Sequence, residues 1–455
     1  YCTLGKLPSF KKNKQNETYR CTSRKDNSMI KFLAKGLIRD KTRSLFPTII
    51  ITITVAIVIF ALGFMRGMLN NVFLDTAVIM SGYEKVVTRA YKKEMQMLPL
   101  DLALMDIEKM ISNLNRDYPN YFWSPRINFG GLIDIPDENK ETRSQSPIMA
   151  IGIDFFSNKS RQTELWKLDQ IIVDGRPPRS PNDILISSKL AKKLEVSTGQ
   201  EATFIGSTMD NAFTTYNFNI SGIFNLNKGQ TDKQMILLDI SGAQDALDMN
   251  GAATEILGFT NDLFYNDEDA IKIRSSFNEN NRSSSDIFAP IMIALRDTNQ
   301  MGTMVDFSNA ALAVIGGIFL VIVMIVLWNM GLMNGLRRYG EIGLRLAMGE
   351  SKGKVYRSMI TEAVIIGLTG TLLGTGLGLS ITYYVQENGI SYAEALEEMA
   401  LKNMVMPNVF YSKVTPDLFY VGLLPGLLAT VLGTMLAGLA IYRREMAQLF
   451  KELET

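Results

Sequence analysis

The sequence predicts an α-helical membrane protein with four transmembrane helices and a large extracytoplasmic α+β domain between the first and second spans. Three observations predict this fold class. Four long windows of the chain contain no charged residue. A long polar segment with both strand-like and helix-like patterns separates the first window from the second. Lysine and arginine residues flank the windows unequally, which orients the spans in the membrane.

Each charge-free window is long enough to cross a bilayer, whose hydrocarbon core takes about 20 apolar residues in a helix. The windows are Leu45–Met65, Phe307–Leu336, Ala363–Gln386 and Leu418–Tyr442. Buried helices of soluble proteins usually have shorter apolar runs, of about 10–14 residues. The first window is also too long for a signal peptide, and no small-residue cleavage site follows it. We therefore expect membrane helices at the end of 29–68 and within 306–336, 361–386 and 417–442.

The flanking charges predict the orientation of the spans, because cytoplasmic loops carry the excess of lysine and arginine. Basic residues precede the first span at Lys31, Lys35, Arg39, Lys41 and Arg43, and they recur between the second and third spans. Glutamates instead dominate the segment between the third and fourth spans. We expect both termini and the segment 337–360 in the cytoplasm, with 69–305 and 387–416 on the outer side.

The two ends of the chain are polar. Residues 1–28 show no periodicity, and we expect the native protein to begin at Met29, with 1–28 an upstream translation, a tag or a disordered tail. From Met29 a cationic amphipathic pattern predicts a cytoplasmic helix that leads into the first span. The segment 443–455 is predicted to be a short cytoplasmic tail.

The outer segment 69–305 mixes strand and helix patterns. Apolar or alternating runs predict strands at Pro147–Ile153, Asp183–Ile186, Gly199–Phe204, Tyr216–Phe224 and Gln234–Leu238. Helices are predicted at Ser188–Leu194, with Ser187 or Ser188 as its N-cap, and at Ser241–Asp248. The acidic residues Asp154, Asp174 and Asp183 are interpreted as solvated turn residues, because the segment shows no catalytic constellation.

The composition excludes several classes of function. Histidine is absent, which rules out histidine-based acid–base catalysis and histidine metal sites. The two cysteines, Cys2 and Cys21, are too few for a structural zinc site. Lys+Arg of 47 against Asp+Glu of 46 gives a net charge of +1, which does not favour nucleic-acid binding. We therefore expect no catalytic residue, no metal site and no bound cofactor in this chain.

The segment Arg337–Ala363, between the second and third windows, has the most informative pattern. Ile342 and Leu346 share one face of a short helix, while Glu341 and Arg345 form a favourable i,i+4 pair on another. This arrangement predicts a short amphipathic helix on the cytoplasmic side. From the spacing alone, a solvated basic loop is an equally good interpretation.

Gly349 is a good helix stop, and Ser351 is a suitable cap for a second helix that runs into the third span. The two signals predict a glycine elbow between two helices. The run Gly349–Val355 lacks the spacing of a phosphate-binding loop and follows no strand, so we expect no ATP site of that class.

Glycines recur at four-residue intervals in the last two spans, where small residues let membrane helices approach closely. The predicted helix-packing residues are Gly370, Gly374, Gly378, Gly422 and Gly426. A glycine in a helix interior lowers helix stability by about 1 kcal/mol relative to alanine, so we expect these glycines to have a packing role. Pro425 is expected to kink the fourth span, because proline removes a backbone donor.

The run Arg337-Arg-Tyr-Gly-Glu-Ile-Gly-Leu-Arg-Leu-Ala-Met-Gly, with Glu362 ahead of a glycine-rich span, closely resembles the permease domain of a known family. FtsX, the MacB efflux pump and the lipoprotein-releasing subunits LolC and LolE share this domain. The resemblance extends over nearly the whole chain, with looser matches at Asp174-Gly-Arg-Pro-Pro and Gly199-Gln-Glu-Ala-Thr. One span, a large outer domain and three further spans is also the order of the family.

By resemblance, a separate ATPase subunit contacts the cytoplasmic elbow. The residues placed on this ATPase-coupling segment are Arg338, Glu341, Ile342, Gly343, Leu344, Arg345, Leu346, Ala347 and Gly349. We expect Ile342 and Leu346 to enter a groove of the ATPase while Glu341 and Arg345 fix the orientation.

The resemblance implies a non-catalytic subunit of an ABC transporter in the bacterial inner membrane, with its large domain in the periplasm. Its implied partners are a LolD-like ATPase, which binds ATP and Mg, and a second permease subunit, identical or paralogous. The runs Phe64–Leu69 and Ser81–Thr88 resemble the lipoprotein-releasing subunits. The predicted function is mechanical extraction of lipoproteins from the membrane towards a periplasmic carrier. The alternatives are MacB-type efflux of peptides or drugs and FtsX-like regulation of cell-wall hydrolases.

Overall fold

The computed structural model describes residues 41–137, 139, 141–157, 159–226, 231–282, 286–298, 301–337, 339–391 and 409–443. Its contacts divide the chain into two compact units. Unit 1 contains the described residues up to Met68, Ala310–Ile390, and those from Phe410 onward. Unit 2 contains Leu69–Asn309 and the described ends of Ser391–Val409. The predicted segment 1–28, the predicted amphipathic helix from Met29 up to residue 40, the predicted tail 443–455 apart from Arg443, and most of 387–416 lie outside the described residues.

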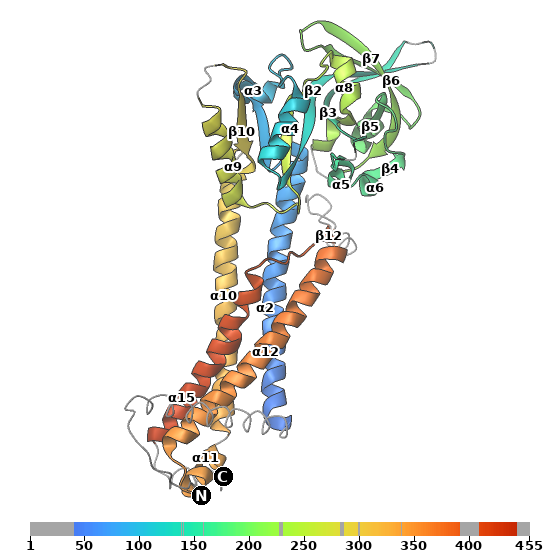
Figure 1. The fold of residues 1–455 in the computed structure, drawn as a ribbon. Helices are drawn as coiled ribbons and strands as arrows, with labels where there is room; N and C mark the ends of the chain where they lie inside the picture. The colour runs from blue at the N-terminus through green and yellow to red at the C-terminus, as the bar shows by residue number, and fades with distance from the viewer. Residues whose placement is uncertain are drawn as a thin grey trace, which may run out of the picture. The chain divides into compact units, whose positions relative to one another are not determined.

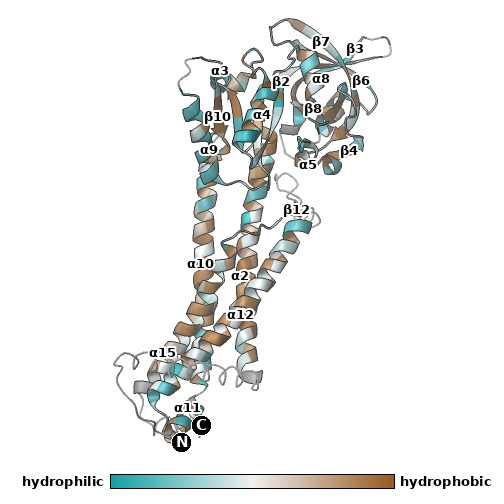
Figure 2. Ribbon diagram, viewed as in Figure 1, coloured by the Kyte–Doolittle hydropathy of each residue, from teal (hydrophilic) through white to brown (hydrophobic). Residues whose placement is uncertain are grey.

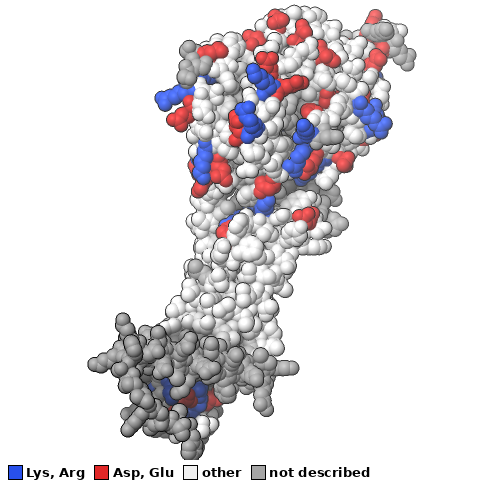
Figure 3. Space-filling model, viewed as in Figure 1, with Lys and Arg blue, Asp and Glu red and all other residues white. Residues whose placement is uncertain are grey.

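Long apolar helices build unit 1 (Figures 1 and 2). They are α2 (Lys41–Thr76), α10 (Met301–Leu336), α11 (Tyr339–Ala347), α12 (Lys352–Asn388), α14 (Leu418–Val421) and α15 (Thr430–Arg443). Four helical stretches are long and apolar enough to span a membrane: Ser44–Ser81, Met301–Leu336, Lys352–Asn388 and Leu418–Leu439. The predicted number of four spans is therefore confirmed by the length and composition of the described helices. On the face shown in Figure 3, the middle of these helices carries almost no charged side chain.

The fourth span changes its helix type at the predicted proline. A π-helical segment, η5 (Leu424–Ala429), separates α14 from α15 and has Pro425 in its first turn. Proline has no backbone N–H to donate, so the α-helical hydrogen-bond ladder is interrupted there. The departure from α geometry therefore coincides with Pro425.

A ten-stranded sheet forms the centre of unit 2 within the described residues. Its strands are β1 (Glu84–Thr88), β2 (Tyr121–Pro136), β3 (Thr142–Ile153), β4 (Ile172–Gly175), β5 (Asp183–Ser187), β6 (Glu201–Ser207), β7 (Phe213–Phe224), β8 (Met235–Asp239), β9 (Glu255–Thr260) and β10 (Pro290–Ala294). The five predicted strands are confirmed as β3, β5, β6, β7 and β8. The sequence did not predict the other five.

Six of these strands close into a ring, because β6 pairs with both β2 and β7. The order around the ring is β2, β3, β8, β5, β7 and β6. Closing a sheet removes exposed strand edges, and it encloses apolar side chains such as Phe129 and Phe204, whose rings meet edge to face at 5.3 Å. The apolar side chains of the ring belong to the main hydrophobic core of unit 2.

The remaining strands form an antiparallel sheet in the order β10, β1, β9 and β2. Strand β2 belongs to both parts: Tyr121–Arg126 pair with β9, and Arg126–Pro136 pair with β3. Arg126 lies at the changeover. One long strand therefore ties the ring to the antiparallel sheet.

Short helices pack around these strands (Figure 1). They are η1 (Ala77–Ser81, π), α3 (Arg89–Glu94), η2 (Met95–Met97, 3-10), α4 (Ile107–Asp117), α5 (Gln162–Trp166), α6 (Leu168–Ile171), α7 (Ser188–Leu194), η3 (Thr231–Gln234, 3-10), α8 (Ile240–Leu247), α9 (Asp267–Asn280) and η4 (Leu295–Asp297, 3-10). The predicted helices are confirmed as α7 and α8, and the Ser187 side chain caps α7 by accepting from the Leu190 N–H.

Asp183 is not the solvated turn residue that the sequence suggested. It is buried, its carboxylate pairs with Arg176 at 2.8 Å, and it accepts a hydrogen bond from the Arg179 backbone N–H at 2.9 Å. Burial acts to raise the pKa of Asp183, but these hydrogen bonds outweigh burial and hold the pKa below its ordinary value. Asp183 therefore fastens the loop that precedes β5.

Candidate functional site

The segment that follows α10 forms the predicted elbow. Helix α11 ends at Ala347, and the Gly349 N–H donates to the Leu346 carbonyl at 3.0 Å. Gly349 has a φ of +89°, a left-handed conformation that favours glycine, and Ser351 stands as the N-cap of α12. The predicted helix stop and helix start are both confirmed.

The apolar face of α11 is buried within the chain. Ile342 and Leu346 are 3% and 5% exposed, and they form a small cluster with Val355 and Met359 of α12. The expectation that these two side chains enter a groove of another protein does not fit this packing. They brace α11 against α12, because burying their apolar surface in the same chain already removes it from water.

The opposite face of α11 is exposed. Leu344 is 56% exposed and Met348, just past the helix, is 74% exposed, with Glu341 and Ala347 beside them on the surface. Gly343 is buried with the bracing face. Within the part of the chain that the structure describes, the elbow thus presents two large apolar side chains on its surface.

Arg345 forms an ion pair with Glu350 across the end of α11, at 2.8 Å and 3.1 Å. The sequence pattern favoured Glu341 as its partner. The Glu350 side chain lies within reach of Arg345 because the left-handed conformation of Gly349 turns the chain back toward the helix. Arg338, the remaining predicted coupling residue, lies outside the described residues.

The predicted glycines of α12 lie against α2. A Cβ on Gly370 would lie 2.8 Å from the Ile51 Cβ, one on Gly374 would lie 2.7 Å from the Thr52 carbonyl oxygen, and one on Gly378 would lie 3.0 Å from the Ala56 Cα. Carbon atoms normally approach no closer than about 3.5 Å. These glycines therefore allow a separation between α2 and α12 that side chains would prevent.

Gly422 and Gly426 approach the same stretch of α2. A Cβ on Gly422 would lie 2.8 Å from a Val55 methyl group, and one on Gly426 would collide with the Thr371 hydroxyl of α12. We call the five residues Gly370, Gly374, Gly378, Gly422 and Gly426 the glycine seam. It joins α2, α12 and the fourth span around Val55, which is fully buried.

An ion pair that the sequence analysis missed closes one end of this helix group. Arg66 of α2 binds the carboxylate of Asp417 and the hydroxyl of Thr415, just before α14. The Lys413 N–H also donates to the Gly63 carbonyl at 2.9 Å. The signal was an arginine just after an otherwise charge-free window.

In unit 2, the end of α2 is fixed by polar contacts. The Asn70 side chain donates to the Leu263 carbonyl and accepts from the Tyr265 N–H, both at 2.9 Å. The Arg126 guanidinium, which is fully buried, donates to the Ile79 carbonyl at 3.1 Å and the Val78 carbonyl at 2.5 Å. Burial lowers the pKa of Arg126 to about 10, so it stays charged at neutral pH. These contacts cap the carbonyl end of a long helix with a cation.

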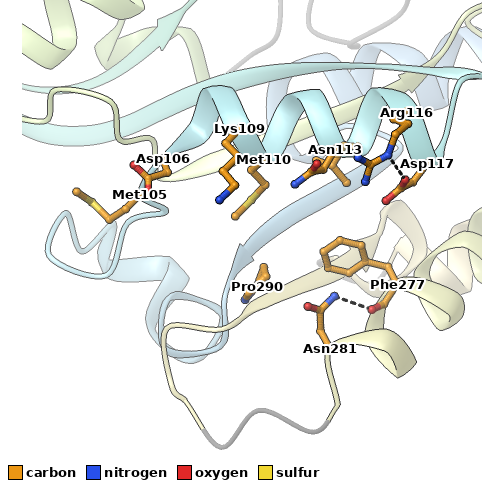
Figure 4. A pocket seen from close by; sticks show the side chains of 11 residues that line it. Met105, Asp106, Lys109, Met110, Asn113, Arg116, Asp117, Phe277, Asn281 and Pro290 are labelled. Atoms are coloured by element: carbon orange, nitrogen blue, oxygen red, sulfur yellow. Dashed lines mark hydrogen bonds and ion pairs between the residues drawn. The ribbon is translucent and has the colours of Figure 1, made fainter.

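An open cleft of about 420 Å³ lies between α4 and the end of α9 (Figure 4). Its charged side chains include Arg116 and Asp117, which pair with each other at 3.0 Å, and Asn281 donates to the Phe277 carbonyl. These three side chains are thus paired with groups beside them at the edge of the cleft. The described residues also contain no cluster of three or more acidic or cysteine side chains that could hold a metal ion.

Comparison with known proteins bears on these features. Residues 313–446, which include the elbow and the glycine seam, match the family described as FtsX-like permease C-terminal. This segment of the chain is therefore similar to the C-terminal domain of FtsX-like permeases. An uncharacterized ABC transporter permease protein of Mycobacterium tuberculosis is 24% identical to this chain over 290 residues, 63% of this chain and 31% of the relative. The chain thus spans about a third of that relative's length.

Among solved structures, the periplasmic region of MacB from Actinobacillus actinomycetemcomitans aligns with 49% of this chain and 92% of its own length. The TM-score is 0.32 and the sequence identity 9%. A likeness at this level decides neither the fold nor the function of unit 2.

Proposed function

We propose that this chain is a permease that couples ATP hydrolysis by a separate ATPase subunit to movement of unit 2 on the periplasmic side of the bacterial inner membrane. The observation that carries the proposal is the elbow, where α11 is braced by Ile342 and Leu346 and exposes Leu344 and Met348. A rigid helix with an uncovered apolar face suits insertion into a groove of a partner. In this proposal the ATP and Mg bind to the partner, which is a LolD-like ATPase.

The glycine seam gives such a partner a mechanical connection. A force on α11 acts on α12 through their shared cluster, and α12 lies against α2 along Gly370, Gly374 and Gly378. Helix α2 is continuous to Thr76, Asn70 holds its far end, and Arg126 holds the π-helix η1 that follows it. We propose that this series of contacts transmits the motion, because close-packed interiors pass on displacements rather than absorb them.

The proposed substrate is a lipoprotein, which a second permease subunit, identical or paralogous, helps to lift from the membrane toward a periplasmic carrier. Support comes from the sequence resemblance of Phe64–Leu69 and Ser81–Thr88 to lipoprotein-releasing subunits. Acyl chains bind a membrane with about 0.8 kcal/mol per buried CH₂. Their extraction therefore needs an external source of free energy, which ATP hydrolysis supplies.

The ATPase proposal is tested by copurification from the native membrane of wild-type permease and of the double variant Leu344→Asp/Met348→Asp. We expect the variant to lose the ATPase subunit while it keeps its fold, because both side chains are exposed. Phe213→Asp, an equally drastic change at an exposed position of unit 2, is the control and should copurify normally. Full retention of the ATPase by the double variant would overturn the elbow as the docking site.

The substrate is tested on the same purified complex. Lipoprotein trapped in the complex supports extraction. ATPase activity that responds only to soluble peptides or drugs would instead favour efflux, and copurification of a cell-wall hydrolase would favour an FtsX-like role. Either result would refute the lipoprotein proposal and leave the coupling proposal intact.

A further inference from the structure

Unit 2 contains a second, larger cavity whose walls differ from those of the cleft in Figure 4. Its volume is about 780 Å³, within the range of about 300–1,000 Å³ typical of small-molecule sites. The end of α2, η2, β3 and β10 line it, with Ile79, Met95, Leu98, Ile151 and Ile293 among the apolar residues. We call it the methionine cavity.

Methionines give this cavity an adaptable mouth. Met80, Met97 and Met149 are 45%, 82% and 36% exposed, although all three are large apolar side chains. Methionine is unbranched and flexible, so such surfaces rearrange around apolar ligands of varied shape. The exposed apolar area therefore suits an aliphatic ligand better than a rigid polar one.

The wall of the cavity contains an ion pair that water does not reach. Lys85 of β1 and Glu255 of β9 meet at 2.7 Å, and their side chains are 3% and 2% exposed. The Lys85 ammonium also donates to the Met80 carbonyl at 3.0 Å and lies 3.8 Å from the Met95 sulfur. All of these partners line the cavity.

One acceptor of this pair is left over. The Oε1 of Glu255 accepts from Lys85, whereas its Oε2 is buried without a hydrogen-bond partner among the described residues. A buried acceptor without a partner is costly, so a ligand that donates to it gains free energy. Lys85 and the buried Arg126 both already act electrostatically on Glu255, so a further buried cation would add uncompensated charge. The geometry therefore favours a neutral N–H or O–H donor.

The charges at the mouth lead to the same conclusion. Lys92 and Lys93 line the cavity together with Asp75, Glu94 and Asp297. Both signs are present, so neither an anionic nor a cationic head group is strongly favoured. The ligand that fits has an aliphatic body and one neutral donor.

We propose that the methionine cavity binds an N-acylated peptide, with the acyl chain along the methionines and the amide N–H on Oε2 of Glu255. The inference rests on the proposed function, since it places part of an acylated substrate on unit 2. It assigns a binding role to Lys85 and Glu255, which the sequence analysis did not single out. The flexible Met95 side chain, which lies against the ion pair, moves aside as the ligand enters.

The test uses the full-length permease in nanodiscs without ATP or ATPase. The probe is a twelve-carbon N-acyl glycine methyl ester that carries a diazirine on the chain, and its partner probe replaces the amide N–H with an ester oxygen. We expect photolabelling to map to residues 72–80 and 95–98, with the amide binding about tenfold more tightly than the ester because one buried acceptor is satisfied. Equal binding of the two probes, or labelling only in the helices of unit 1, would overturn the proposal.

Two variants sharpen this test. The double variant Lys85→Met/Glu255→Met removes the pair while keeping the site neutral and apolar, and it should bind both probes equally. Met149→Trp narrows the cavity and should reduce labelling several-fold, whereas Met105→Trp, at the cleft of Figure 4, should not. If the amide probe binds but no lipoprotein copurifies with the complex, the substrate proposal fails and the cavity stands. If lipoprotein copurifies and the probes bind equally, only the cavity proposal fails.

Discussion

Replacing Gly374 by alanine tests whether the glycine seam sets the distance between α2 and α12. The new Cβ would lie 2.7 Å from the Thr52 carbonyl oxygen and 2.8 Å from the Val55 Cβ. Normal contact between carbons is about 3.5–4.0 Å, so the two helices must separate locally by roughly 0.7–1 Å. Such overpacking typically costs about 1–3 kcal/mol.

Gly376 provides the matched control two residues along the same helix. It is exposed, and a Cβ added there meets no atom within 4 Å. Both substitutions gain about 1 kcal/mol of helix propensity, which therefore cancels in the comparison. Gly374→Ala should be less stable than Gly376→Ala by about 1–3 kcal/mol.

The assay is unfolding of the full-length variants in detergent micelles by a titration with sodium dodecyl sulfate, followed by circular dichroism. The midpoint of Gly376→Ala should equal or exceed that of the wild type, and the midpoint of Gly374→Ala should fall below that of Gly376→Ala and lie at or below that of the wild type. If the two alanine variants unfold at the same midpoint, the close contact with α2 contributes nothing and the argument for the seam is wrong.

Three further predictions concern side chains whose roles the structure separates. Ile342→Ala should destabilise the elbow by about 2 kcal/mol or more, because buried apolar contact is lost. Leu344→Ala should change stability by less than about 0.5 kcal/mol. The rate of proteolysis at the elbow measures both effects. Arg126→Leu should cost roughly 3 kcal/mol because two charged hydrogen bonds to the carbonyls of η1 are lost, and hydrogen exchange of residues 78–82 should rise. Burial raises the pKa of Glu84 well above its ordinary value, since neither carboxylate oxygen has a partner among the described residues. Because the pKa of Glu84 is higher in the folded state, its contribution to stability is fully present below the pKa of the unfolded state. That contribution is lost as the pH rises towards the pKa of the folded state. Glu84→Gln should therefore raise the melting temperature more at pH 8 than at pH 5.

Each of these predictions has a clear contrary result. Equal protease sensitivity of Ile342→Ala and Leu344→Ala would contradict the assignment of the two faces of α11. Unchanged exchange in Arg126→Leu would show that other contacts hold η1. A Glu84→Gln gain that is the same at both pH values would mean that Glu84 is ionised in the folded protein.

Much of the helical architecture follows from the sequence because its signals are local. The four apolar windows, the stop at Gly349 and the cap at Ser351 depend only on nearby residues, and all are found in the structure. The seam glycines were also recognisable, because a four-residue spacing places them on one helix face. Their partner helix was not predictable, since spacing in one helix carries no information about its neighbour.

Strand β1 shows why half of the sheet was missed. Its sequence, Glu84–Thr88, begins with two charged residues, yet all five residues are buried. Burial is possible because Lys85 finds Glu255 on the neighbouring strand and Glu84 lies in an environment that favours its neutral form. Both causes are tertiary, and a pattern of local hydropathy does not contain them.

The elbow also shows that a local sequence pattern does not identify the tertiary neighbour of a helix face. The pattern correctly placed Ile342 and Leu346 on an apolar face, but whether that face meets the same chain or another is decided by the path of α12. Val355 and Met359, which bury it, come after the glycine turn. The sequence therefore predicted the helix and its amphipathic character, and assigned the apolar face to the wrong neighbour.

The division of α11 into a covered and an uncovered face has a consequence for how such transporters diverge. In the docking mode that we propose, substitutions at Leu344 and Met348 alter the surface that meets the ATPase without disturbing the fold, whereas those at Ile342 and Leu346 disturb the packing of α11 on α12. Pairing specificity and structural integrity can therefore drift independently within one nine-residue helix. After duplication of such a gene, each copy could become specific for its own ATPase by exchanging only a few surface side chains. Two transport systems in one cell would then not exchange subunits, and neither would lose stability.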